Sequence, residues 1–552
     1  MLNMIWPLTT ATLLLNAITL PFSRGEVFTS MANIDMLLQM GEDVSRIIDN
    51  YVEEDERRLE QLKKLSAEYK SHKVQVHGQE GTDNVIVNPV ESFAIVKQLA
   101  DNWRYVEHLM KANSAEKMIQ NFTHHTPNTI VRLPSEEDVI GMAVGLMRIQ
   151  DVYKLDTHDM AEGKIRGVLD GRKLTAYDCL EIARVAYNKQ DFYHTLLWAT
   201  EAWDRVQKEE EPTADEATIL EYIAFAMFKQ GNIEWAIHYT TLIKQVDPNH
   251  PRASGNLKYY QDLLDPEGKP RKIDPKKLPP PTNRRPDDLS IPERDVYEAL
   301  CRSEYPIPDK DRAKLYCYYK RNRPFLKLAP IKVEVMHWKP KIVYFRGVIS
   351  DEEIAVIKQL ASPLLKRATV HNADTGQLET ASYRISKSAW LKDTEHEVVK
   401  RISDRIDMMT DLTMETAELL QIANYGIGGH YDPHFDMSTT NDPYSFESLN
   451  AGNRIATVLF YISQPEAGGG TVFTTHKITV EPSKHDAAFW FNVLQGGEPD
   501  MTTRHAACPV LAGTKWVANN IFPRVRYFCY AAVACLTSIS IIEQLLTDFY
   551  LK

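Results

Sequence analysis

The chain has 552 residues, of which 43% are hydrophobic and 25% are charged. This length predicts several domains, because a single hydrophobic core stops growing at about 250–300 residues. The formal net charge of −11 argues against nucleic acid as a partner, because binding of phosphates requires a basic face.

Residues 1–24 are predicted to form a secretory signal peptide. The apolar run from Met4 to Phe22 is short and interrupted by prolines, so we expect no membrane span beyond the signal. A secretory route gives meaning to two other features. Asn121 begins the only N-glycosylation sequon of the chain. Cys301 and Cys317 flank a short segment, and we expect a disulfide between them in an oxidising compartment.

Residues 25–140 are predicted to form a helical N-terminal domain that joins two chains. A heptad ladder runs through its first part, and most positions of the ladder are apolar. Such a ladder predicts association between helices, either in two chains or in an intrachain hairpin. The ladder consists of Leu37, Val44, Tyr51, Arg58 and Leu65 in one series and of Gly41, Ile48, Asp55, Leu62 and Tyr69 in the other.

Residues 141–264 are predicted to form a second helical domain built from two similar hairpins. Tyr187 and Trp198 recur at the same spacing as Phe228 and Tyr239. This recurrence resembles a tetratricopeptide repeat pair. Two repeats are fewer than normally stand alone, so we expect flanking helices to complete the stack.

The second half of the chain has a different texture. Residues 265–290 are rich in proline and predict a semi-rigid linker. In residues 291–525, short β-rich runs such as 455–462 and 487–491 alternate with turns. This alternation predicts a β-sandwich or barrel with supporting helices, following an all-α N-terminal half.

One motif in the β-rich region carries recognisable chemistry. His430 with Asp432 and His434 with Asp436 form two overlapping H-x-D pairs. An H-x-D pair places an imidazole and a carboxylate on the same face of an extended chain. With a third histidine it completes a facial triad, which leaves positions on Fe(II) open for a bidentate 2-oxo acid and for oxygen. Spacing alone does not choose between the two pairs.

The choice of the third histidine can be narrowed, because a 2-oxo acid with a second carboxylate also requires a cation near the metal. The histidines that follow Asp436 are His476, His485 and His505. The distal carboxylate of 2-oxoglutarate requires a buried cation as its partner. Only His505 is followed at short range by such a group on a strand-like segment, namely Lys515. Their even separation suggests inward-facing positions on adjoining strands, so His505 is preferred.

Ordered motifs surround this constellation. They are Tyr425-Gly426-x-Gly428-Gly429, Tyr431-x-Pro433-His434-Phe435-Asp436, Asn453-Arg454-Ile455-Ala456-Thr457, Gly468-Gly469-Gly470-Thr471-Val472-Phe473 and Thr503-Arg504-His505-Ala506-Ala507-Cys508-Pro509-Val510-Leu511-x-Gly513-x-Lys515-Trp516. The set resembles the catalytic core of collagen prolyl 4-hydroxylase alpha subunits, and the resemblance covers most of the chain. It implies a double-stranded β-helix (jelly-roll) dioxygenase core at about residues 415–525. It also implies hydroxylation of C4 of proline in X-Pro-Gly sequences of collagen-like chains.

The resemblance also implies roles for single residues. His434, Asp436 and His505 are expected to bind Fe(II), and Lys515 is expected to anchor 2-oxoglutarate. We expect Tyr425 and Thr457 in the 2-oxoglutarate pocket and L-ascorbate as a further cofactor. The repeat region is expected to bind the proline-rich peptide, since aromatic grooves recognise polyproline II chains. The aromatic candidates are Tyr187, Tyr193, Trp198, Tyr222, Phe225 and Tyr239.

The resemblance fails in residues 526–552, which we interpret as a divergent tail. In the family Cys508 pairs with a terminal cysteine, for which Cys529 and Cys535 are available here. The family also implies an α2β2 tetramer with protein disulfide isomerase as the beta subunit, in the lumen of the endoplasmic reticulum. The chain ends without a retention tetrapeptide, which agrees with retention by such a partner. The alternatives are a 2-oxoglutarate hydroxylase of another secreted protein and an inactive paralogue that binds proline-rich peptides.

Overall fold

The computed structural model describes residues 26–76, 103–112, 134–165, 171–264, 273–288, 290–371, 377–439 and 452–523. The predicted signal peptide, the divergent tail and Asn121 lie outside the described residues. The chain divides into two compact units, one made by residues 33–133 and the other by the remainder. No helix in the described ranges is long and apolar enough to cross a membrane.

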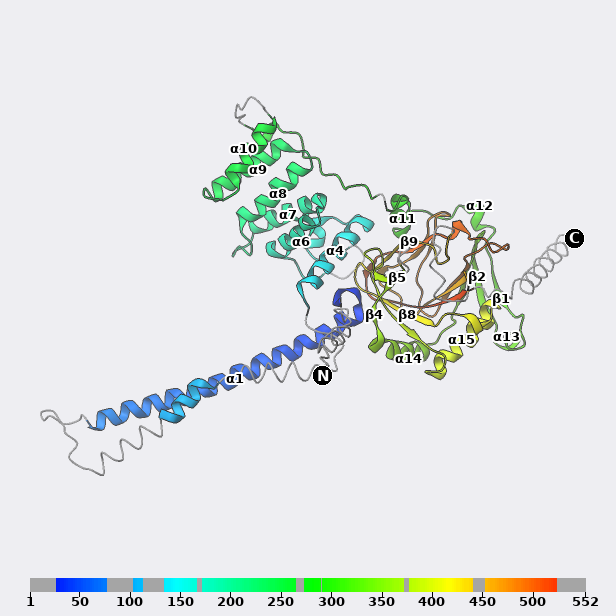
Figure 1. The fold of residues 1–552 in the computed structure, drawn as a ribbon, viewed down its shortest axis with the longest axis horizontal. Coiled ribbons are helices and arrows are strands. Elements are labelled where there is room, and N and C mark those ends of the chain that lie inside the picture. Colours follow the sequence, from blue (N-terminus) through cyan, green and yellow to red (C-terminus); the bar gives the residue numbers. More distant parts are fainter. Residues whose placement is uncertain are drawn as a thin grey trace, which may run out of the picture. The chain divides into compact units, whose positions relative to one another are not determined.

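The smaller unit contains the long helix α1 (Met31–Val76), as the heptad ladder predicts (Figure 1). Arg58, a member of the ladder, donates a hydrogen bond of 2.6 Å to the carbonyl oxygen of Ala112. At this level, therefore, one series of the ladder faces another segment of the same chain. Ile48, from the other series, is 56% exposed. Association of two chains through α1 stays a prediction.

The two predicted helical hairpins are confirmed as α6 with α7 and α8 with α9, and flanking helices extend the stack. The helices are α4 (Glu136–Tyr153), α5 (Thr157–Ala161), α6 (Ala176–Asn188), α7 (Phe192–Val206), α8 (Glu216–Lys229), α9 (Ile233–Val246) and α10 (Ala253–Leu264). Thr175 and Asp178 start α6 with a capping box, in which each side chain accepts a hydrogen bond from the other residue's main-chain N–H. Ala183 and Ala199 are completely buried where α6 packs on α7.

A buried charge network fastens α7 to α4. The ring of His194 is 3% exposed and lies 2.6 Å from Asp191 and 3.1 Å from Asp151. Burial alone lowers the pKa of His194, but the two carboxylates outweigh it and raise the pKa to about 9. Arg285 adds a second cation, 2.8 Å from Asp151. The imidazolium therefore acts as a bridge between two acidic side chains.

The proline-rich segment, residues 278–286, follows one edge of the repeat. The side-chain amide of Asn232 donates to the carbonyl oxygen of Thr282 at 2.7 Å and accepts from the main-chain N–H of Thr282 at 2.8 Å. Gln230 makes the same pair of bonds with Arg284, at 3.1 and 3.2 Å. The sequence predicts only a semi-rigid linker here, and the structure adds a fixed main-chain contact with the repeat.

Two large sheets and two short ribbons form the described part of the C-terminal region, which confirms a β-rich half after a helical half. The nine-stranded sheet has the order β1-β2-β3-β14-β10-β17-β8-β7-β4, and the four-stranded sheet has the order β13-β12-β15-β9. The strands of the large sheet are β1 (Cys317–Lys320), β2 (Ile331–Trp338), β3 (Lys341–Arg346), β4 (Lys366–Arg367), β7 (Lys387–Leu391), β8 (Leu420–Tyr425), β10 (Arg454–Tyr461), β14 (Ala487–Phe491) and β17 (Lys515–Pro523). Those of the small sheet are β9 (Tyr431–His434), β12 (Thr471–Phe473), β13 (Ile478–Val480) and β15 (His505–Ala507). Two-stranded ribbons are made by β5 (Thr369–His371) with β6 (Leu378–Thr380) and by β11 (Ala467–Gly468) with β16 (Val510–Ala512).

Successive side chains of β10 point to opposite faces of the large sheet, and the two faces contact different parts of the domain. Ala456, Val458 and Phe460 join the core under helices α14 (Asp351–Ala361) and α15 (Glu397–Thr410), which run along the outside of the barrel (Figure 1). Thr457 and Tyr461 point the other way, toward the small sheet. The inner face is therefore available for a site.

The remaining helices are η1 (Val27–Thr29), η2 (Pro275–Lys277), α11 (Arg294–Cys301), α12 (Asp309–Arg312), α13 (Pro324–Leu328), η3 (Ser362–Leu364), η4 (Met414–Thr416) and η5 (Met501–Thr503).

The cysteine pairing differs from both expectations. A disulfide joins Cys301 to Cys508, so the predicted Cys301–Cys317 bond is wrong, and so is a bond from Cys508 to Cys529 or Cys535. Cys317 is free and exposed on the edge strand β1. The reason is tertiary, because apolar residues of α11 pack against β12 and β15 of the small sheet. This packing brings Cys301 to Cys508 and separates it from its neighbour in sequence.

Candidate active site

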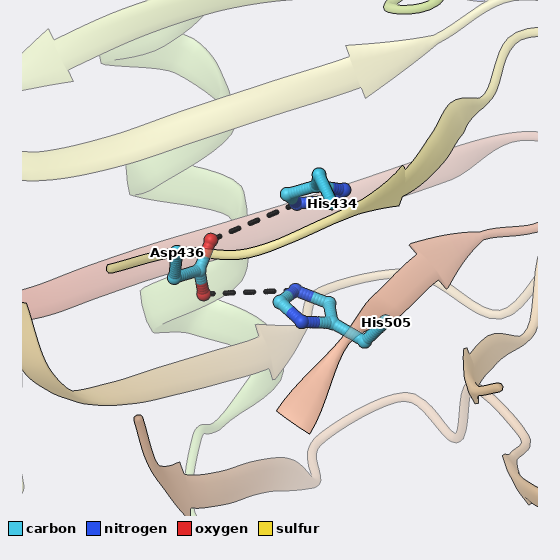
Figure 2. A group of neighbouring side chains, drawn as sticks. All are labelled: His434, Asp436 and His505. Atoms are coloured by element: carbon cyan, nitrogen blue, oxygen red, sulfur yellow. Dashed lines mark ion pairs between the residues drawn. The ribbon is translucent and has the colours of Figure 1, made fainter. Parts of the chain in front are cut away.

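Two neighbouring strands of the small sheet bring three metal-binding side chains together (Figure 2). His434 ends β9 and His505 begins β15, and the two residues are directly paired across the strands. Asp436 lies between their rings, with carboxylate oxygens 3.6 Å from Nε2 of each histidine. The potential ligand atoms all lie within 4.8 Å of one another. This spacing suits one metal ion bound by two imidazoles and one carboxylate.

Hydrogen bonds outside the triad set the orientation of each ligand. Nδ1 of His434 lies 2.7 Å from the carbonyl oxygen of Asp432, and Nδ1 of His505 lies 3.0 Å from that of Thr503. A main-chain carbonyl only accepts, so Nδ1 carries the proton and Nε2 keeps a free lone pair facing Asp436. The hydroxyl of Thr457 donates to Asp436 at 2.7 Å. Thr457, expected in the 2-oxoglutarate pocket, thus also orients a ligand.

The charge states of the triad suit a divalent metal. Burial favours a neutral carboxyl at Asp436, but the two histidines and the Thr457 hydroxyl hold its pKa well below the usual range. Burial lowers the pKa of His505 to about 4, so its imidazole is neutral near pH 7. Carboxylate and neutral imidazole are the forms that coordinate metals. The donor set therefore fits the Fe(II) expected from the sequence.

A cavity of about 490 Å³ opens beside the triad, between the two sheets. Lys515 and Tyr425 enter it from the large sheet, opposite each other on β17 and β8. His505 and Lys515 therefore lie on facing sheets, and our expectation of adjoining strands is wrong. Both nevertheless line the same cavity, because each points inward from its own sheet.

Lys515 is a buried cation available to a ligand. Its side chain is 1% exposed, and its ammonium lies 5.0 Å from the centre of the Tyr425 ring. Burial lowers the pKa of Lys515 to about 7, with a weaker opposing effect from Glu481. Among the described residues, no carboxylate forms a salt bridge with this ammonium. A ligand carboxylate in the cavity would supply the missing partner.

The other histidine candidates lie apart from this site. His430 is 2% exposed and pairs with Asp432 at 3.3 Å, and neither residue lines the cavity. His485 pairs with Asp351 at 3.0 Å, and the ring of His476 lies tilted against that of His337, with centres 4.6 Å apart. The structure thus groups the second H-x-D pair, and not the first, with a third histidine.

Part of the predicted aromatic set forms a cluster on the repeat. Tyr187 contacts Tyr222 and Phe225 edge to face, with ring centres 5.1 and 5.3 Å apart. Phe192 and Phe228 extend the cluster, with ring centres 5.8 and 6.1 Å from that of Phe225. The sequence candidates omitted these two, although Phe228 occupies the repeat position equivalent to Tyr187.

Three other aromatic candidates lie outside this cluster. Trp198 is completely buried and donates to Gln150 at 2.9 Å, so its predicted contact with substrate is wrong. Tyr239 is half-buried and packs against Trp203, with ring centres 5.9 Å apart. Tyr193 lies against the buried His194. Aromatic residues at repeat spacing serve the core as often as the surface, and spacing does not separate the two.

Comparisons with known proteins agree with this site. Residues 30–167 match the family described as prolyl 4-hydroxylase alpha-subunit, N-terminal region. Residues 176–266 match the prolyl 4-hydroxylase peptide-substrate-binding domain, and residues 420–522 match the 2OG-Fe(II) oxygenase superfamily. The C-terminal region is therefore a jelly-roll oxygenase domain.

The similarity extends through most of the chain. The chain is 51% identical to prolyl 4-hydroxylase subunit alpha-1 of Caenorhabditis elegans over 503 residues, which cover 91% of this chain and 89% of that protein. It is 47% identical to subunit alpha-2 of Caenorhabditis elegans, covering 90% and 91% of the two chains. It is 41% identical to subunit alpha-1 of Homo sapiens, covering 89% and 92%. The chain belongs to the prolyl 4-hydroxylase alpha-subunit family.

Proposed function

We propose that this chain is the catalytic alpha subunit of a procollagen-proline 4-dioxygenase. It hydroxylates C4 of proline in X-Pro-Gly sequences of collagen-like chains and converts 2-oxoglutarate and oxygen to succinate and carbon dioxide. The observation that carries this proposal is the group of His434, Asp436 and His505, which shares one cavity with the uncompensated cation of Lys515. The names of the relatives supply the substrate class.

Each residue of the cavity has a separate task. His434, Asp436 and His505 would hold Fe(II), and the bound metal would supply the oxygen activation that no side chain provides. Lys515 binds the distal carboxylate of 2-oxoglutarate, and the ring of Tyr425 lies beside its ammonium. L-ascorbate, the reductant used by the family, is proposed as a further cofactor.

The aromatic cluster of the repeat is proposed to hold the peptide. Tyr187 of α6 and Tyr222 and Phe225 of α8 bring ring faces and edges together. Rings arranged in this way suit a polyproline II chain, which is already extended and loses little entropy on binding. The match to a peptide-substrate-binding domain supports this assignment.

The chain is proposed to work in the lumen of the endoplasmic reticulum, in an α2β2 tetramer with protein disulfide isomerase. The Cys301–Cys508 disulfide supports an oxidising compartment. Expression with and without the isomerase tests the assembly. Aggregation that co-expression prevents would support it, and a soluble, active monomer without the isomerase would contradict it.

The activity is tested with the co-expressed complex, a (Pro-Pro-Gly)-type peptide, Fe(II) and 2-oxoglutarate. We expect 4-hydroxyproline and succinate in equal amounts. His434→Ala should abolish both products, because two ligands do not hold the metal geometry. His485→Ala is the matched control, since His485 lies outside the cavity. Succinate without hydroxyproline would indicate another secreted substrate, and neither product would indicate an inactive peptide-binding paralogue.

A further inference from the structure

The loop between β8 and β9 joins a strand of the large sheet to a strand of the small sheet. It follows Tyr425 at the end of β8 and leads to His434 at the end of β9. Helix α4, which precedes the repeat, packs directly on this loop. A Cβ added to Gly428 would lie 2.6 Å from the carbonyl oxygen and 2.9 Å from the Cα of Gly145 in α4. Main chain therefore touches main chain, with no flexible side chain between them.

Two polar side chains of α4 form hydrogen bonds with the main chain next to both metal-binding strands, before β9 and after β15. Arg148 donates to the carbonyl oxygen of Gly428 at 3.0 Å, before β9. Tyr153 donates to the carbonyl oxygen of Pro509 at 2.6 Å, after β15. The two segments are also bonded to each other, since the N–H of Gly428 donates to Val510 at 2.9 Å. One helix thus fixes both segments at once.

A short path leads from this contact to the triad. Tyr431 begins β9, and its ring stacks on the imidazole of His434 with centres 3.5 Å apart and planes 15° apart. The next residue, Asp432, accepts the hydrogen bond that orients His434. A displacement at Gly428 therefore reaches the metal ligand through a few residues of extended chain and a stacked ring.

We infer that Gly145, Arg148 and Tyr153 of α4 are positioning residues for the metal site. The helix that leads into the peptide-binding repeat holds the two strands that carry His434 and His505. This inference rests on the proposed function, since it concerns the same metal site. It makes the geometry of the oxygenase site depend on a helix outside the oxygenase fold.

The first test is Gly428→Ala in the co-expressed complex. Gly347→Ala is the matched control, because both glycines have a positive φ, +66° and +63°, but a Cβ at Gly347 meets nothing within 4 Å. Both variants place an alanine at a similar positive φ, and only Gly428→Ala pushes against α4. Titration of the metal-free complex with Co(II), followed by its absorption bands, should show at least tenfold weaker binding for Gly428→Ala. Gly347→Ala should stay within twofold of the parent.

Two milder variants keep the inference testable if Gly428→Ala does not fold. Gly145→Ala brings a Cβ to 3.1 Å from the carbonyl oxygen of Ile427, whereas its helical control Gly255→Ala meets nothing within 4 Å. Tyr153→Phe removes one hydrogen bond and keeps the ring. For Gly145→Ala and Tyr153→Phe we expect altered Co(II) bands and a lower kcat, with the peptide KM unchanged.

The outcomes separate this inference from the proposed function. Co(II) affinity and bands equal to the parent in Gly145→Ala and Tyr153→Phe would overturn the inference, even in an active hydroxylase. An equal loss in Gly347→Ala would also overturn it, because strain without the contact would then suffice. A parent that binds Co(II) normally but makes no hydroxyproline would refute the proposed function alone.

Discussion

Binding of 2-oxoglutarate should weaken as pH rises, because the anchoring ammonium of Lys515 titrates near neutrality. Burial lowers the pKa of Lys515 to about 7 in the ligand-free protein. A bound carboxylate favours the charged form, so binding above pH 7 must take up a proton. Below that pH the anchor is already charged and affinity is full. Above it, each pH unit costs about 1.4 kcal/mol, which is a tenfold rise in Kd.

The measurement is anaerobic calorimetry of the Co(II)-loaded complex with 2-oxoglutarate at pH 6 and pH 8. Between these values Kd should rise about tenfold, and buffers of different ionisation enthalpy should report uptake of nearly one proton at pH 8. Arginine keeps its charge at both pH values, so binding of 2-oxoglutarate to Lys515→Arg should not depend on pH. The binding should be weaker than in the parent, because the planar guanidinium needs different room from an ammonium. Lys515→Met should weaken the binding free energy of 2-oxoglutarate by roughly 3–5 kcal/mol, since it leaves the buried carboxylate of the ligand unpaired.

Two results would refute this reasoning. A parent Kd that is equal at both pH values would show that Lys515 does not change its charge on binding. The same pH dependence in Lys515→Arg would assign the titration to a different group.

Three further predictions concern the surroundings of the site. Thr457→Val removes the hydrogen bond to the carboxylate ligand and should weaken Co(II) binding about 10- to 100-fold in the same titration. Cys301→Ser should lower the unfolding free energy by about 2–5 kcal/mol in denaturant titrations, while Cys317→Ser should change nothing, because only the first opens the disulfide. The pKa of His194 is raised to about 9, above the unfolded value, so its contribution of about 3 kcal/mol is complete below pH 6.5 and is lost as pH rises through 9. Melting curves of the parent should show this loss, and those of His194→Asn should not.

Features set by local pattern could be predicted from the sequence. The H-x-D spacing predicts that His434 and Asp436 serve one site, and it holds although Asp436 lies in the bend after β9; the recurrence of Tyr187 as Phe228 indicates the repeat. Both signals are local in sequence. The strand pairing that sets His505 opposite His434 is non-local. His505 could be predicted only through its separation from Lys515, and the two residues lie on different sheets and not on adjoining strands.

Features set by packing between distant segments could not be predicted. The cysteines of the disulfide are separated by 207 residues, and nothing near Cys301 indicates that α11 packs on the small sheet. Burial separates Trp198 from the surface aromatic residues, and spacing carries no information about it. The sequence marks Gly428 only as part of a motif. Its contact with α4 could not be predicted, because that helix lies far away in sequence.

The proline-rich segment bears on how the protein tells its own chain from its substrate. Asn232 and Gln230 each require a main-chain N–H, at Thr282 and at Arg284, two residues apart. Proline has no N–H, so a Gly-Pro-Pro repeat offers a donor only at every third residue. Such a chain satisfies at most one of the two amides. The edge of the repeat therefore disfavours a (Pro-Pro-Gly)-type chain, although the neighbouring aromatic cluster is proposed to accept such a polymer, and a high concentration of this peptide should leave the segment in place.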